Sequence, residues 1–132
     1  MESLPPGEVA RVADFRAALR AFLRKSERNA RKSGLTPQRY LLLLMIKGAP
    51  DGSSKSTVTE LAERLQLAQS TVTELVRRAE ETGLVQREQS ASDGRVAHLR
   101  LTPEGDRRLM RAFTSNEQER QELRAAIAHI ED

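Results

Sequence analysis

The chain has 132 residues and no cysteine, and 22 lysines and arginines stand against 19 aspartates and glutamates, giving a net charge of +3 and a pI near 9.8. This length fits one domain, or one small domain with helices that cannot bury their apolar sides alone. The mild basic charge is compatible with a polyanionic partner without requiring one. The lack of cysteine excludes disulfides, thiolate metal sites, cysteine nucleophiles and thiol-based redox sensing by this chain.

The N-terminal third is predicted to form two helices. Apolar residues at three- and four-residue spacing indicate a long helix from about Gly7 to Lys32, ending near Gly34. A second helix is expected to begin at Thr36-Pro37, because threonine caps free amide groups and proline suits the first helical turn. Its body, RYLLLLMIKG, is apolar nearly all round, so we expect it in the core. Residues 48–54 are expected to form a loop.

Residues 57–83 have the pattern of a helix-turn-helix. Thr57 and Glu60 have the spacing of a capping box, and an apolar helical face follows them. Gln66-Leu67-Ala68 is expected to form the turn, and Gly83 is expected to end the second helix. The side chains expected to pack inside this pair are Val58, Leu61, Ala62, Leu65, Leu67, Val72, Leu75, Val76 and Ala79.

A β-hairpin is predicted to follow the second of these helices. Ala97, Leu99 and Leu101 recur with a period of two, which indicates a strand. The segment from Leu84 to about Gln89 is the expected partner strand. Residues 90–94, with an Asp-Gly turn signal, are expected to form the hairpin tip.

The C-terminal segment is predicted to be helical, starting from a cap at Thr102-Pro103-Glu104. Near residues 115–118 the chain either restarts as a last helix or continues as one bent helix. The first and last helices carry apolar stripes that the small central module can hardly bury. We therefore expect dimerisation through them, the alternative being that they pack on each other within one monomer. The expected organisation is an N-terminal dimerisation helix at 1–34, a winged helix-turn-helix core at 35–102 and C-terminal dimerisation helices at 103–132.

The second helix of the helix-turn-helix presents a polar face that suits a DNA major groove. Glutamine bonds adenine edges or phosphate, serine and threonine hydroxyls reach phosphates or bases, and arginine pairs with guanine or phosphate. The alternative is an ordinary solvated helix face. The candidate DNA-binding residues on this helix are Gln69, Ser70, Thr71, Thr73, Glu74 and Arg77.

Arg95, at the hairpin tip, is the main candidate outside that helix. A guanidinium on a narrow hairpin can enter a minor groove, where negative potential is concentrated. Asp93 is acidic and repels DNA, so its expected role is to hold Arg95 or the wing backbone. The alternative is a solvated turn with an incidental ion pair.

These segments resemble the DNA-binding core of the multiple antibiotic resistance regulator (MarR) family. The resemblance rests on QSTVTELVRRAEETGLV, on the motif Asp93-Gly94-Arg95 and on LTPEG after the last strand. It implies a winged-helix homodimer with interlocking terminal helices, in which the helix from about Gln69 reads a near-palindromic operator. It also implies that Arg95 contacts the minor groove and that Asp93 orients it.

The same resemblance implies a pocket for a small-molecule effector where the dimer helices meet the winged domain. Phenolic and other aromatic anions are typical ligands of the family. Seven basic residues between Arg20 and Arg39 accompany the single acid Glu27, and those around Arg24 to Arg39 could suit such an anion. The alternative for this basic stretch is a solvated helix face with helix-end charges. The chain itself shows no ligand fingerprint.

Three features depart from the family pattern. Gln66 stands at a turn position where glycine is common, which costs on the order of 1 kcal/mol if the residue is left-handed. Ala68 stands where the family often has a capping serine, which weakens that cap by about 1 kcal/mol unless Gln69 or water substitutes. The C-terminal region is short for the family, so the dimer geometry is less well defined by the resemblance.

The leading hypothesis from the sequence is a transcriptional regulator, acting as a repressor, that binds duplex DNA as a homodimer. The alternative from another class is a winged-helix module that binds protein and not DNA. An enzyme is not expected, because His98 and His129 lack HExxH spacing and no phosphate-binding glycine loop or nucleophile and base pair accompanies them. No catalytic residue, metal or cofactor is expected.

The sequence is also expected to belong to a soluble, cytoplasmic protein without a membrane partner. Its longest apolar run, Tyr40 to Ile46, is too short to cross a bilayer. The N-terminal MESLPPGEVARV lacks the basic-then-apolar order of a signal peptide.

Overall fold

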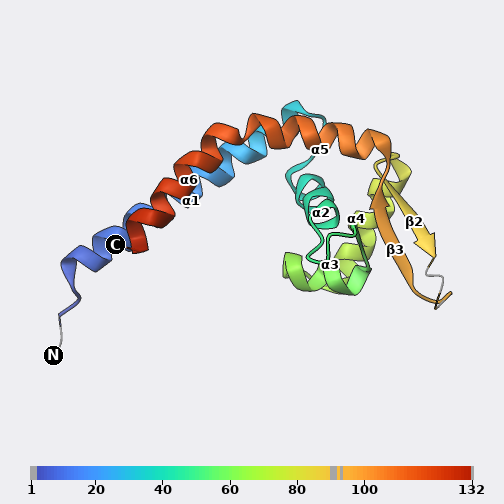
Figure 1. Ribbon diagram of the computed structural model, residues 1–132, viewed down its shortest axis with the longest axis horizontal. Helices are drawn as coiled ribbons and strands as arrows, with labels where there is room; N and C mark the ends of the chain where they lie inside the picture. Colours follow the sequence, from blue (N-terminus) through green and yellow to red (C-terminus); the bar gives the residue numbers. More distant parts are fainter. Residues whose placement is uncertain (1–2, 90–91, 93, 132) are drawn as a thin grey trace.

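The computed structural model describes residues 3–89, 92 and 94–131, and these residues form six helices and a small antiparallel sheet that lies at one end of the molecule (Figure 1). The mainly α architecture with a small β-wing, expected from the sequence, is confirmed. In chain order the elements are α1 (Pro6–Lys32), α2 (Pro37–Lys47), β1 (Lys55–Ser56), α3 (Val58–Leu65), α4 (Gln69–Glu81), β2 (Val85–Gln89), β3 (Ala97–Leu101), α5 (Pro103–Ser115) and α6 (Glu117–Glu131).

The molecule consists of a long helical arm and a winged unit below it. In the arm, α1 and α6 run side by side in opposite directions, and α5 leads from the winged unit into α6 (Figure 1). The last helix restarts at Glu117 after a break at Asn116, which settles the choice between a restart and one bent helix. The two terminal helices therefore do pack on each other within the monomer.

Three threonines fix the starts of helices α2, α3 and α5, as their positions in the sequence predict. The Thr36 side chain accepts a hydrogen bond from the Arg39 amide at 3.1 Å at the start of α2. At α3, the Thr57 hydroxyl accepts from the Glu60 amide at 3.2 Å, and the Glu60 carboxylate accepts from the Thr57 amide at 2.9 Å. At the start of α5, the Thr102 hydroxyl accepts a hydrogen bond from the Gly105 amide at 3.0 Å. Such caps satisfy amides that have no partner inside the helix, so they define where each helix begins.

The core of the winged unit is apolar and closed to solvent. Side chains from helices and sheet meet in it, and each contributes about 1.5–3 kcal/mol through the removal of apolar surface from water. Its largest fully buried apolar side chains are Leu42, Leu43, Ile46, Leu61, Val72, Val76, Leu84 and Leu99. The predicted interior of the helix-turn-helix is largely confirmed, although Val58, Leu65, Leu67 and Leu75 are only partly buried.

The sheet has the strand order β1-β3-β2 and is antiparallel throughout. The hairpin pairs Val85 with Leu101 and Gln89 with Ala97, in agreement with the predicted partner strands. The sequence did not predict β1, because two residues are too few to show a period. Ser56 of β1 pairs with Leu99 and is buried at the edge of the core.

A close approach joins the start of α5 to the end of α4. Gly105 lies against the Leu84 carbonyl oxygen, and a Cβ atom at this position would lie 2.1 Å from that oxygen. The Thr102 hydroxyl donates to the Gly83 carbonyl at 2.6 Å, and the Thr102 amide donates to the Leu84 carbonyl at 3.0 Å. Glycine is therefore required for the packing of α5 onto the winged unit.

A buried polar cluster lies where the arm meets the winged unit. Asn116, with 1% of its surface exposed, donates from Nδ2 to the Tyr40 hydroxyl at 3.2 Å and to the Ser26 hydroxyl at 3.3 Å. Its Oδ1 accepts from Asn29 Nδ2 at 2.7 Å. These bonds tie the break between α5 and α6 to α1 and α2.

Membrane-spanning segments were sought in the part of the chain that the structure describes. No helix there combines enough length with enough apolar character to cross a bilayer.

Candidate nucleic-acid interface

Helix α4 has one buried face and one exposed face. Val72, Val76 and Ala79 are fully buried, and their three- and four-residue spacing places them on the side of the helix that packs on the core. Ser70, Thr71, Thr73 and Arg77 are exposed. The core thus fixes the orientation of α4 and leaves a polar surface available to a partner.

The turn between α3 and α4 contains the left-handed residue that its sequence suggested. Gln66 has φ 57° and ψ 45°, a conformation that costs a residue with a Cβ atom about 1 kcal/mol. Its Nε2 donates to the Glu63 carbonyl at 2.6 Å, and the following Leu67 amide donates to the Ala62 carbonyl at 3.1 Å. These bonds close the turn and bring α4 across α3.

The N-terminus of α4 begins without a side-chain cap. Ala68 occupies the N-cap position with extended backbone angles, and its methyl group cannot accept a hydrogen bond. No side-chain hydrogen bond caps this end of α4, and Nε2 of the neighbouring Gln69 donates to the Thr59 hydroxyl of α3 at 3.2 Å. Gln69 instead links the exposed surfaces of the two helices.

Glu74 binds the two arginines in the middle of α4. Arg77 donates from Nε to Glu74 Oε2 at 2.9 Å and from Nη2 to Glu74 Oε1, and it also pairs with Glu81. Arg78 donates from Nε to Glu74 Oε1 at 3.0 Å. Hydrogen bonds from Arg77 and then Arg78 lower the pKa of Glu74 to about 2, so this carboxylate is charged at every pH of interest.

The hairpin supports Arg95 and is attached to α4 at its base. Arg95 is exposed, and one residue separates it from the start of strand β3. The base of the hairpin is linked to α4 by Arg87, whose Nε donates to the Glu80 carboxylate oxygens at 3.0 and 3.1 Å. Sequence reasoning missed this pair, because a helix residue and a strand residue seven positions apart share no periodic signal.

Asp93, predicted to orient Arg95, lies outside the described residues, so its role stays a prediction. The other candidates occupy two places, the exposed surface of α4 and the hairpin. The start of α4 and the end of the hairpin lie on the side of the molecule opposite the arm formed by α1 and α6 (Figure 1). This is the arrangement in which a helix enters a groove and a wing contacts the adjoining DNA.

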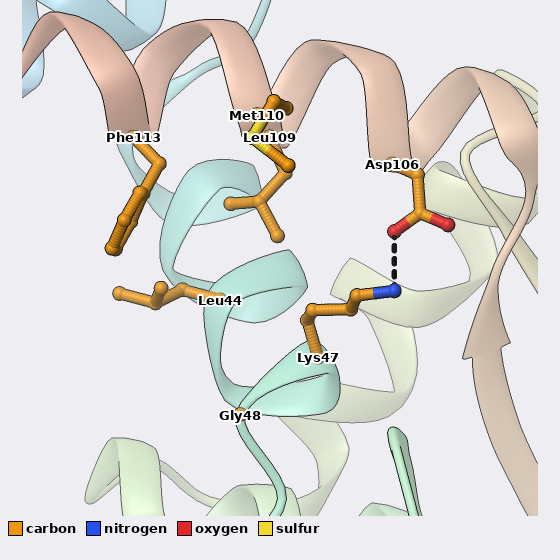
Figure 2. Close-up of a pocket in the computed structure, with 7 residues that line it drawn as sticks. All are labelled: Leu44, Lys47, Gly48, Asp106, Leu109, Met110 and Phe113. Carbon is orange, nitrogen blue, oxygen red and sulfur yellow. Dashed lines mark ion pairs between the residues drawn. The ribbon is translucent and has the colours of Figure 1, made fainter.

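A separate apolar pocket lies between α2 and α5, in the angle between the winged unit and the arm. Figure 2 shows Leu44 of α2 facing Leu109 and Phe113 of α5, with the Lys47 ammonium 3.0 Å from Asp106 at one end. Its volume is about 290 Å³. The basic residues of the first helix lie elsewhere: Arg24 and Arg28 line shallow hollows along α1.

The two histidines lie far apart in the fold, one on the hairpin and one on the arm. His98 is on β3, and His129 Nε2 of α6 lies 3.5 Å from the Asp14 carboxylate of α1. In the described part of the chain, no group of three or more histidine, aspartate or glutamate residues is arranged to hold a metal ion.

The helix pair α3 and α4, followed by an antiparallel hairpin, defines this chain as a winged helix-turn-helix protein. A family model described as "MarR family" matches residues 33–96. The chain is 34% identical over 99 residues to the HTH-type transcriptional repressor MdtR of Bacillus subtilis, a match that covers 72% of this chain and 61% of MdtR. It is 30% identical over 111 residues to the HTH-type transcriptional regulator YsmB of the same organism, covering 81% of this chain and 73% of YsmB. The chain therefore belongs to the MarR family.

The fold agrees with this assignment. A mutant of MarR from E. coli, solved in complex with operator DNA, superposes on 82% of this chain and 75% of its own with a TM-score of 0.67 and 21% identity. MdtR and YsmB both bear the names of transcriptional regulators.

Proposed function

We propose that this protein is a transcriptional regulator that binds duplex DNA as a homodimer and represses transcription from a near-palindromic operator. The observation that carries the proposal is the exposed polar face of α4, held outward by a fully buried apolar face. MdtR is named a repressor, and the E. coli MarR mutant was solved with operator DNA, which supports the same role here. A regulator of this kind works in the cytoplasm, on the chromosome.

The proposed DNA contacts come from α4 and from the hairpin. Gln69, Ser70 and Thr73, near the start of α4, are proposed to contact bases and phosphates in the major groove, with Thr71 beside them. Arg77, held by Glu74, is proposed to contact a base or a phosphate one turn further along the helix. Arg95 is proposed to enter the minor groove from the hairpin, oriented by Asp93. Two copies of α4 would enter successive major grooves about 34 Å apart.

The homodimer is proposed to form through the arm, with 1–34 and 103–132 as dimerisation regions and 35–102 as the DNA-binding core. Although α1 and α6 pack on each other, several of their apolar side chains stay exposed. These residues are Val9, Val12, Leu23 and Ile127. A second copy of the arm would remove this apolar surface from water.

The pocket between α2 and α5 is the proposed site of a small-molecule effector (Figure 2). Its walls are apolar, which suits an aromatic ring, and its position between the arm and the winged unit would couple ligand binding to the separation of the two α4 helices. A ligand releases DNA only if it binds unequally to the DNA-competent and incompetent arrangements. Aromatic acids tested by thermal shift, with and without operator, would identify such a ligand. A DNA-binding protein without an effector is the simpler version of this proposal.

The experiment that tests DNA binding is titration of a bound duplex with Arg95→Ala, Thr73→Ala and Arg77→Ala at several salt concentrations. Loss of Arg95 or Arg77 should weaken binding, and loss of an ionic contact should lower the salt slope by about one. Thr73→Ala should weaken binding to the specific site more than to random duplex. Unchanged affinity and salt slope for Arg95→Ala would show that the wing lies outside the interface. If Thr73→Ala and Arg77→Ala changed only the thermal stability, α4 would not be part of the interface.

The carboxylates of α4 favour a second candidate, a winged-helix module that binds protein. Glu74, Glu80 and Glu81 reduce the positive charge that a DNA-binding helix would otherwise carry. A protein-binding module should show little salt-dependent affinity for any duplex. A gel-shift series at increasing salt with wild-type protein separates the two candidates.

A further inference from the structure

The middle of α4 carries an ion cluster built around one carboxylate. Both oxygens of Glu74 are bound by Arg77, and one of them is also bound by Arg78. Glu81, on the next turn of the helix, accepts a further hydrogen bond from Nη1 of Arg77. The Arg77 guanidinium is thus fixed from two sides by carboxylates on its own helix.

This cluster is poorly suited to a purely structural role. The side chains of Glu74 and Arg77 are 44% and 54% exposed, and exposed ion pairs contribute little to stability because water screens them. Glu74 also lies on the helix face that is proposed to meet DNA, where a carboxylate is repelled by the phosphates. A charge that lowers affinity for every duplex is of use at an interface only if it improves the choice among duplexes.

The contacts of Arg77 indicate how that choice could be made. A guanidinium has five N–H groups. Glu74 engages the one on Nε and one on Nη2, and Glu81 engages one on Nη1. One N–H therefore stays available on each terminal nitrogen, the number that a two-bond contact with guanine O6 and N7 requires.

We propose that Glu74 is a specificity-determining positioning residue, which holds the Arg77 guanidinium in one orientation for a guanine edge and prevents it from turning to the phosphates. The inference rests on the proposed function, since it concerns the same DNA interface. The pKa of Glu74, lowered to about 2 by its arginine partners, keeps the carboxylate charged throughout the neutral range. Arg78, bound to the same carboxylate, is restrained in the same way.

The test compares Glu74→Gln with Glu81→Gln, two variants that remove the same charge from the same helix. Glutamine has nearly the same helix propensity as glutamate, so both proteins should fold like wild type. Each is titrated by fluorescence anisotropy against a duplex selected by wild-type protein, its single base-pair substitutions and a random-sequence duplex. Both variants should bind random duplex more tightly, with a steeper salt dependence. Glu74→Gln should lose discrimination, by about tenfold at one base pair in each half-site. Glu81→Gln, which removes one hydrogen bond from Arg77 where Glu74→Gln removes two, should lose distinctly less.

A second comparison isolates the pairing of Glu74 with Arg77. The double variant Glu74→Gln with Arg77→Ala should discriminate no less well than Arg77→Ala alone, because Glu74 acts through Arg77. Discrimination by Glu74→Gln within twofold of wild type, or an equal loss in Glu81→Gln, would overturn the inference while leaving DNA binding intact. Absence of salt-dependent duplex binding by wild-type protein would overturn the proposed function and this inference with it.

Discussion

Helices α4 and α1 are both amphipathic, but the monomer buries them to different extents. In α4, Val72, Val76 and Ala79 are fully buried and the exposed side is polar. In the 27 residues of α1, only Ser26 and Ala30 are buried, while Val12 and Leu23 are 45% and 48% exposed. The surface that the monomer leaves open is therefore polar on one helix and apolar on the other.

This difference assigns a different kind of partner to each helix. A polar face fixed by a closed core suits a polar ligand such as DNA, because its side chains need not rearrange the helix to reach it. An apolar face suits a protein surface that removes it from water. Four changes test this difference: at the contact of α5 with the winged unit, at the apolar face of α1, at the buried polar cluster that joins the arm to the winged unit, and at the start of α4.

The largest effect is expected from a change where α5 packs on the winged unit. Gly105→Ala places a Cβ atom 2.1 Å from the Leu84 carbonyl oxygen, so α5 cannot dock without moving the backbone. We expect a loss of about 3 kcal/mol in the free energy of unfolding, measured by urea denaturation. Gly7→Ala is the control, since its Cβ atom would meet only Arg11 Nη1 at 3.7 Å. Equal stability of the two variants would contradict the close approach.

A change in the apolar face of α1 should affect association and leave the monomer folded. Val12→Gln with Leu23→Gln removes apolar surface that the proposed dimer buries, at about 1.5–3 kcal/mol for each fully buried side chain. Because both residues are already partly covered, we expect the dimer dissociation constant to rise about a hundredfold, measured by sedimentation equilibrium. Arg20→Gln with Arg24→Gln should have little effect. Equal dissociation of both variants would mean that the apolar face of α1 lies outside the dimer interface.

A change at the junction should have an intermediate effect on stability. Asn116→Ala removes the partner of Ser26, Asn29 and Tyr40, which leaves buried polar groups unsatisfied. We expect a loss of about 2 kcal/mol, measured by chemical denaturation. Ser115→Ala, at the adjacent exposed position, should cost less than about 0.5 kcal/mol. A similar small loss for Asn116→Ala would show that the cluster does not hold the arm to the winged unit.

The smallest effect is a gain at the start of α4. Ala68 already has N-cap backbone angles, so Ala68→Ser should supply the missing hydrogen bond and add about 0.5–1 kcal/mol to the free energy of unfolding. Ala125→Ser, exposed within α6, should cost a few tenths of a kcal/mol, as serine does within a helix. Thermal denaturation of the two variants distinguishes them. A loss at both positions would show that residue 68 does not act as a cap.

Local signals explain how much of this fold could be predicted from the sequence. The caps at Thr36, Thr57 and Thr102 depend on residues three positions away, and the hairpin depends on an apolar period of two. Both kinds of pattern can be recognised in the sequence. The left-handed Gln66 could be predicted from its place in the turn. By contrast, the partners of Asn116 lie 76 to 90 residues away, and no sequence pattern brings them together.

The candidate site shows the same division. The polar face of α4 follows from helical spacing, so its residues could be proposed from sequence. The three- and four-residue spacings of Glu74, Arg77 and Arg78 were also visible, but the concentration of both arginines on one carboxylate depends on side-chain geometry. The link from Arg87 to Glu80 depends on how the hairpin packs on α4.

The central claim is that the exposed face of α4 reads duplex DNA. Selection of bound sequences from a random duplex pool tests it most directly, because it examines DNA binding and site symmetry together. We expect enrichment of two related, inverted half-sites whose centres are about one helical turn apart, with affinity that falls steeply as salt increases. A pool that shows no enriched sequence after repeated selection, together with binding that does not depend on salt, would contradict it.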